Sequence, residues 1–93
     1  MKVEQFYNKN QFHLYGGGVD ELQSYNSLVV VIDHKNKTIT LGYDWDYSTT
    51  TSKHVYLFLE EYSDINFYGI RNKREYVRKL IEQCKILYDE NME

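Results

Sequence analysis

The alternation of hydrophobic and polar positions is clearest in the middle of the chain. Residues 28–32 form an apolar run rich in β-branched side chains, and apolar and polar residues alternate from Ile39 to Trp45. Both patterns are typical of strands, the first buried and the second half-buried. Turn-forming residues at 33–37 separate them, so we predict a hairpin whose first strand begins near Leu22. A shorter strand is expected at residues 11–15.

Two helices are expected after the hairpin. The hydroxyl tract at residues 48–52 predicts a helix start, because its side chains can accept hydrogen bonds from the free N–H groups of a first turn. Asn72 followed by Glu75 resembles a capping box and predicts a second, longest helix over residues 73–89. The expected fold is therefore α+β, with a small antiparallel sheet of about three strands packed against two C-terminal helices (β-β-β-α-α) in a single domain, 1–93.

Composition sets the class of protein. A chain of 93 residues supports one modest core, and 42% hydrophobic with 27% charged residues is an ordinary globular balance. The longest apolar run is far shorter than the roughly 18 residues of a membrane span, and residues 1–5 do not begin a secretory signal. We therefore expect a cytoplasmic protein. Ten tyrosines against four phenylalanines favour a binding surface, although coding DNA rich in A and T also produces such a composition.

The glycines, histidines and cysteine of the chain do not predict a catalytic or metal site. Gly16, Gly17 and Gly18 are followed by Val-Asp-Glu instead of the Lys-Ser/Thr of a phosphate loop, so we interpret them as a flexible turn. The three histidines lack the spacing of a helical metal site, and His54 is expected to bond to backbone or to a hydroxyl. The single Cys84 is interpreted as a small buried hydrophobe. We expect no enzyme activity, no catalytic residues, no cofactor and no metal.

Acidic residues near the end of the hairpin give the first candidate binding site. Asp44 and Asp46 flank Trp45. On a strand both carboxylates point away from Trp45, so the first interpretation is a solvated face of the sheet and the second is an acidic patch for a basic partner. The partner-binding candidates, acidic and aromatic, are Asp44, Trp45, Asp46, Tyr47, Glu60 and Glu61.

Basic residues in the second helix give an alternative site. Residues 71–79 hold five Lys/Arg against one Asp/Glu, whereas residues 1–70 hold five against nine. Pairs such as Arg71–Glu75 lie four residues apart and would partly neutralise this strip, and a net charge of −3 opposes polyanion binding. A solvated helix face is therefore the first interpretation. The alternative nucleic-acid-binding set is Arg71, Lys73, Arg74, Arg78 and Tyr76.

A sequence pattern spans roughly residues 22–60. It begins with Ser24-Tyr25-Asn26-Ser27-Leu28-Val29 and continues with Ser48-Thr49-Thr50-Thr51-Ser52-Lys53-His54, ending in Phe58-Leu59. It resembles a Ser-Tyr-x-Thr/Ser-x-Val … Ser-x-Thr-Thr-x-x-His-x-x-x-Phe-Leu pattern of small uncharacterised proteins encoded by phages and plasmids of low-GC Gram-positive bacteria. Ser27 stands where that pattern more often has Thr. The resemblance implies a mobile genetic element and a bacterial host cell as the context.

This context leads to a functional hypothesis and two alternatives. The leading hypothesis is a non-enzymatic protein-binding module that inhibits or modulates a host protein, such as a CRISPR nuclease or another nucleic-acid-handling defence effector. The first alternative is a nucleic-acid-binding accessory protein that uses the basic helix. The second is a structural or assembly subunit of a phage particle. No membrane partner is expected, and assembly into a homo-oligomer stays open.

Overall fold

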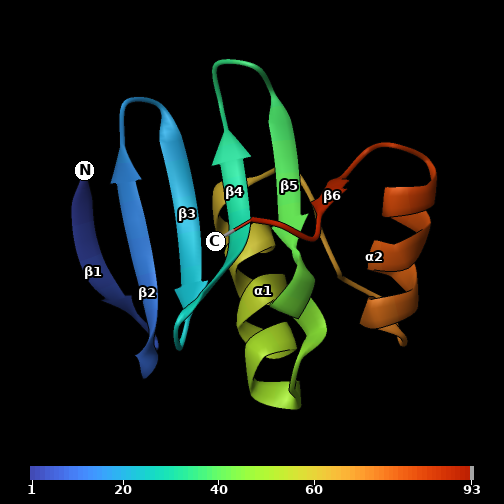
Figure 1. The fold of residues 1–93 in the computed structure, drawn as a ribbon. Helices are drawn as coiled ribbons and strands as arrows, with labels where there is room; N and C mark the ends of the chain where they lie inside the picture. The colour runs from blue at the N-terminus through green and yellow to red at the C-terminus, as the bar shows by residue number, and fades with distance from the viewer. Residues whose placement is uncertain (93) are drawn as a thin grey trace.

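The computed structural model describes residues 1–92. A six-stranded sheet forms one layer, helix α1 covers one face of it, and α2 lies beyond the β5–β6 edge (Figure 1). The strands are β1 (Lys2–Phe6), β2 (Asn8–Gly16), β3 (Val19–Ser24), β4 (Ser27–Asp33), β5 (Thr38–Gly42) and β6 (Leu87–Asp89). The helical segments are the 3-10 turn η1 (Tyr43–Asp46), α1 (Thr49–Tyr62) and α2 (Lys73–Glu82).

The strands lie side by side in the order in which the chain makes them. Strands β1 to β5 form an antiparallel meander, and β6 pairs in parallel with β5. A parallel neighbour needs a crossover connection, and α1 and α2 together make that crossover. The result is a mixed sheet whose two edges are β1 and β6.

Side-chain alternation decides which face of the sheet meets α1. Leu22, Val30 and Leu41 are register partners on β3, β4 and β5, and all three are fully buried. They pack with Val55 and Phe58 of α1 in one core cluster. Each such side chain contributes roughly 1.5–3 kcal/mol by leaving water. Burial on this face therefore fixes the position of α1.

The predicted β-β-β-α-α order is wrong, because the sheet has six strands and its last strand follows both helices. One cause is that the strand expected from Leu22 to Ile32 is really β3 and β4 joined by a tight turn. Tyr25 has a left-handed φ of 55° at this turn. The residue types around it do not predict this conformation. The turn at Gly17–Gly18 and the β4–β5 hairpin are as predicted.

The two edge strands were missed for a related reason. Only Phe6 of β1 is buried, so β1 lacks the alternation that marks a half-buried strand. The predicted helix over 73–89 ends instead at Glu82, where Cys84 turns the chain with a left-handed φ of 59°. Cys84 is exposed and not buried as predicted, while Ile86 enters the core.

Both predicted helix starts are confirmed. The Ser48 hydroxyl accepts a hydrogen bond from the Thr51 N–H at 3.1 Å, and Asn72 Oδ1 accepts one from the Glu75 N–H at 3.0 Å. These caps satisfy N–H groups that the first turn leaves free. No helix within residues 1–92 is long and apolar enough to cross a membrane.

Candidate binding surface

The segment between β5 and α1 carries two highly exposed tyrosines beside a buried tryptophan. Strand β5 ends at Gly42, where a Cβ atom would lie only 2.4 Å from the Leu28 carbonyl oxygen, so only glycine fits. The chain then turns through η1 instead of continuing as the predicted strand to Trp45. In this turn Trp45 is 4% exposed, whereas Tyr43 is 64% and Tyr47 is 77% exposed.

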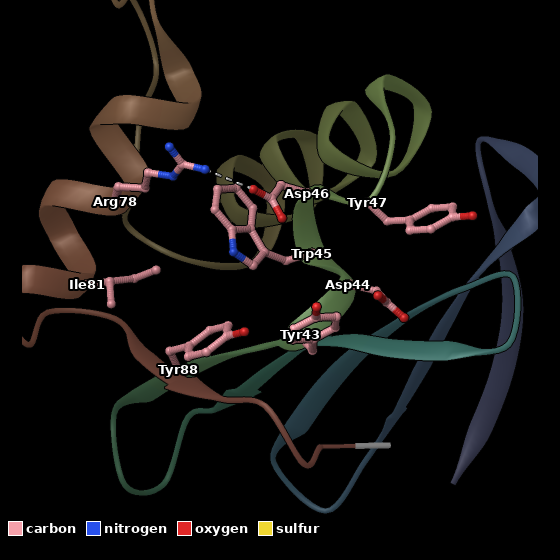
Figure 2. A pocket seen from close by; sticks show the side chains of 8 residues that line it. All are labelled: Tyr43, Asp44, Trp45, Asp46, Tyr47, Arg78, Ile81 and Tyr88. Atoms are coloured by element: carbon pink, nitrogen blue, oxygen red, sulfur yellow. Dashed lines mark hydrogen bonds and ion pairs between the residues drawn. The ribbon is translucent and has the colours of Figure 1, made fainter.

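Figure 2 shows the side chains around a shallow cavity of about 460 Å³ at this turn. Tyr88 of β6 approaches from the other side and is 44% exposed. Arg78 and Ile81 of α2 complete the rim. We call the following residues of this region the aromatic surface: Tyr43, Asp44, Trp45, Asp46, Tyr47 and Tyr88.

The two carboxylates of the aromatic surface differ in their partners. Asp44 Oδ2 accepts a hydrogen bond from the Ser27 hydroxyl at 2.7 Å, and no cation of residues 1–92 forms an ion pair with it. Asp46 Oδ2 lies 3.4 Å from Arg78 Nη2 and 3.7 Å from Arg74 Nε. Asp44 is thus oriented but not neutralised, whereas Asp46 is paired with two arginines.

The environment of Tyr88 reflects this negative charge. Its pKa is raised from the ordinary value, first by burial and then by Glu90, Tyr43, Asp46 and Asp44, in that order. A raised phenol pKa indicates surroundings that disfavour a further anion. The aromatic surface therefore combines exposed tyrosines with one carboxylate, that of Asp44, which has no ion-pair partner among residues 1–92.

Glu60 and Glu61 are not part of this surface. They lie near the far end of α1, roughly 17 Å from its start by the rise of a helix. Glu60 Oε2 accepts a hydrogen bond from the Phe67 N–H at 3.2 Å, and Glu61 accepts one from the Tyr7 hydroxyl at 3.5 Å. Of the six predicted partner-binding residues, the structure brings together the four from Asp44 to Tyr47.

The alternative basic set lies next to the acidic one. Arg74 and Arg78 reach Asp46, so two sets that were predicted as separate alternatives meet between η1 and α2. The expected ion pairs within α2, such as Arg71 with Glu75, do not form in the part of the chain that the structure describes. Tyr76 packs edge-on against a core phenylalanine at a ring-centroid distance of 5.7 Å and is half-buried.

The polar residues of the recurring pattern form a corner between the β3–β4 turn and α1. The Ser24 and Thr51 hydroxyls lie 3.0 Å apart, and Ser48 donates to the Thr51 hydroxyl at 3.2 Å. His54 Nδ1 donates to the Thr50 carbonyl oxygen at 2.7 Å, in agreement with the structural role expected for it. A cavity of about 640 Å³ opens at this corner and shares Asp44 and Tyr47 with the aromatic surface.

Sequence reasoning missed a chain of histidines and carboxylates at the opposite edge of the sheet. His13 Nδ1 lies 3.0 Å from Glu4 and His13 Nε2 lies 2.6 Å from Asp20, whose other oxygen is 2.6 Å from His34 Nε2. His13 is buried and also contacts the rings of Tyr15 and Tyr62, with centroids at 4.7 and 4.4 Å.

Only the strand register brings this chain of residues together. Glu4 is the direct register partner of His13, and Asp20 lies two positions from the β3 residue that pairs with His13. Because β1 was not predicted, the sequence carried no signal for the contact with Glu4. Among residues 1–92, no group of three or more His, Cys, Asp or Glu side chains is arranged to hold a metal ion.

The fold and the surface define a small α+β domain with a six-stranded mixed sheet and an exposed aromatic turn. The chain belongs to DUF8033, described as a family of unknown function, whose family model matches residues 1–78. The match includes η1, α1 and the start of α2. No curated protein and no solved structure matches the chain. The resemblance to proteins of phages and plasmids stays a prediction.

Proposed function

We propose that the protein is a non-enzymatic protein-binding module that presents the aromatic surface to a partner protein. The observation that carries this proposal is the pair of highly exposed tyrosines, Tyr43 and Tyr47, which flank the buried Trp45 in the sequence of one turn. Tyrosine offers a large amphipathic contact area with few rotatable bonds, and such residues dominate the binding energy of many interfaces. Because the buried Trp45 already fixes this turn, the turn loses little further conformational entropy on binding.

The charge of the surface supports a partner with a basic contact region. Asp44 accepts a hydrogen bond from Ser27 and has no ion-pair partner among residues 1–92, and the pKa of Tyr88 is raised first by burial and then by the charge of Glu90. A basic side chain of the partner would find an oriented carboxylate here. An acidic, aromatic surface of this kind suits the cationic groove of a nucleic-acid-handling protein. A host defence effector such as a CRISPR nuclease is therefore the partner class that we propose.

A tagged pull-down compares the proposed surface with a matched control. The bait is used as wild type, as the double variant Tyr43→Ala/Tyr47→Ala, and as Tyr68→Ala, from a lysate of a low-GC Gram-positive bacterium with and without nuclease. Tyr68 is 92% exposed and lies outside the aromatic surface. We expect one stoichiometric protein that survives nuclease treatment, that is lost with the double variant and that is retained with Tyr68→Ala.

Two results would count against this function. Equal recovery of the same protein by the wild type and the double variant would remove the aromatic surface from the interface. Recovery of many nucleic-acid-associated proteins that vanish on nuclease treatment would instead favour the basic residues of α2.

A further inference from the structure

A second cavity, of about 550 Å³, lies between the first turns of α1 and the start of α2. Its wall on the α1 side carries hydroxyl groups, and its wall on the α2 side carries four cationic side chains. The residues on which the inference rests are Tyr56, Arg71, Lys73, Arg74 and Arg78.

The charge in this cavity is opposite to that of the whole protein. Four cations line it, whereas the nearby carboxylates are Glu75 in the wall and Asp46 beside two of the arginines. Arg71 and Lys73 have no carboxylate partner within the part of the chain that the structure describes. A protein with a net charge of −3 thus concentrates positive charge in one concave place. Such a place attracts anions.

On the α1 side of the cavity, the Ser52 hydroxyl donates to backbone carbonyl oxygens, so Tyr56 is the hydroxyl that we consider for contact with an anion. Tyr56 has its pKa raised, mainly by burial, while a hydrogen bond with Ser52 and the charge of Arg74 act in the opposite direction. The Tyr56 phenol can serve as a hydrogen-bond donor. Lys73 Nζ lies 5.9 Å from the centre of the Tyr56 ring, which holds the cation over the same wall.

Two of the arginines are only loosely engaged. Their contacts with Asp46, at 3.4 and 3.7 Å, are at the long end for an ion pair, and both side chains are about half exposed. Exposed ion pairs of this kind are weak, so Arg74 and Arg78 can turn to another anion at little cost. Guanidinium groups bind the oxygens of a phosphate in bidentate fashion.

We propose that this cavity is a binding site for a phosphate group, contacted by Arg71 and Lys73 directly and by Arg74 and Arg78 in exchange for Asp46. The same chemistry is offered by a small phosphate compound and by a nucleic-acid strand. This site and the aromatic surface are proposed to bind different molecules, although Arg78 borders both cavities.

The test is a titration of the ¹⁵N-labelled protein with inorganic pyrophosphate, followed by amide chemical shifts at constant ionic strength in sodium chloride. We expect saturable shifts at the starts of α1 and α2. The double variant Arg71→Gln/Lys73→Gln should bind at least about tenfold more weakly, since a charge-assisted hydrogen bond is worth about that factor. The matched control Lys9→Gln/Lys35→Gln removes two exposed lysines outside the cavity and should bind like the wild type.

A variant that binds pyrophosphate more tightly gives a second test, because a folding defect would not increase affinity. Asp46→Asn frees Arg74 and Arg78 and should strengthen pyrophosphate binding about two- to fivefold, the range of a surface ion pair. Shifts that do not saturate, an equal loss in both double variants, or weaker binding by Asp46→Asn would overturn the proposal.

A second ligand identifies the source of the phosphate. A single-stranded oligonucleotide of about twelve residues is titrated beside pyrophosphate. Much tighter binding of the oligonucleotide, with a steep dependence on salt, would assign the site to a nucleic-acid strand. Equal or tighter binding of pyrophosphate would assign it to a small phosphate compound. Both results support a phosphate site, and neither depends on a protein partner.

Discussion

The β1–β3 edge of the sheet and the aromatic surface both gather aromatic and titratable side chains, but their polar groups differ in availability. At the β1–β3 edge, both nitrogens of His13 face carboxylate oxygens, and Asp20 uses its second oxygen on His34. At the aromatic surface, Asp44 has no cationic partner among residues 1–92, and Tyr43 and Tyr47 are highly exposed. The polar groups of the β1–β3 edge therefore bond to one another. In our proposal, those of the aromatic surface are available to another molecule.

The difference shows why residue type alone is a poor guide to a site. Histidines and carboxylates are the usual signs of catalysis, yet here they bond to one another. Both ring nitrogens of His13 are engaged by carboxylate oxygens, so neither is available to a substrate. The proposed binding surface instead contains tyrosines, two of which, Tyr43 and Tyr47, are highly exposed.

The largest expected effect comes from the residue that anchors the aromatic surface. Trp45→Ala should lower the free energy of unfolding by about 3–5 kcal/mol, because it removes a large buried side chain and leaves a cavity. Urea denaturation measures this. Tyr47→Ala, in the same turn, should change stability by no more than about 0.5 kcal/mol. A large loss in Tyr47→Ala would mean that this tyrosine is structural, and the contrast between anchor and exposed surface would fail.

The next effect tests the chain of hydrogen bonds through His13 at the β1–β3 edge. His13→Phe keeps a ring between Tyr15 and Tyr62 but removes both hydrogen bonds, so the partly buried Asp20 loses a partner. We expect a loss of about 2–3 kcal/mol in the free energy of unfolding. His34→Gln, at the exposed end of the same chain, should cost less than about 1 kcal/mol. Equal losses in the two variants would contradict a graded network centred on His13.

A smaller effect is expected at the hydroxyl corner, which borders the aromatic surface. Ser48→Ala removes the acceptor of the Thr51 N–H and should cost about 1 kcal/mol in thermal or urea unfolding. Thr49→Ala is the matched control, because Thr49 is exposed and its hydroxyl makes no cap. If the two alanine variants are equally stable, the cap contributes nothing to the start of α1.

The smallest effect concerns the phenol of Tyr62, whose ring contacts His13. The pKa of Tyr62 is raised to about 12, first by burial and then by the charges of Glu61, Glu4 and Asp20. A folded-state pKa above the ordinary 10.0 stabilises the protein below pH 10, and this stabilisation is lost as the pH rises towards 12. We expect a loss of no more than about 1 kcal/mol after solvent screening. Tyr62→Phe should remove this part of the alkaline decline, and an unchanged decline would contradict the assignment.

The sequence predicted those parts of the fold that local residues determine. The two helix starts follow from side chains three residues from the N–H groups they bind, and the β4–β5 hairpin follows from one turn between two patterned runs. Strand β6 could not be predicted in this way. It pairs with β5 across both helices, and its apolar residues also fit a continuation of α2.

The candidate site was predicted in part for the same reason. The run from Asp44 to Tyr47 was identified, but strand alternation was extended past Gly42 and assigned Asp44 and Asp46 to one solvated face. The close approach of Gly42 to Leu28 ends the strand, and the turn then gives the two carboxylates different partners. The contribution of Tyr88 depends on β6 and was therefore outside the reach of local patterns.

The most direct test of the central claim is site-specific photo-crosslinking in the bacterial cell. A photoreactive phenylalanine analogue replaces Tyr47 in one variant and Tyr68 in the other, both highly exposed positions. The account predicts one discrete crosslinked protein with the probe at position 47 and none with the probe at position 68. The same crosslinked protein from both positions, or none from position 47, would contradict a partner bound at the aromatic surface.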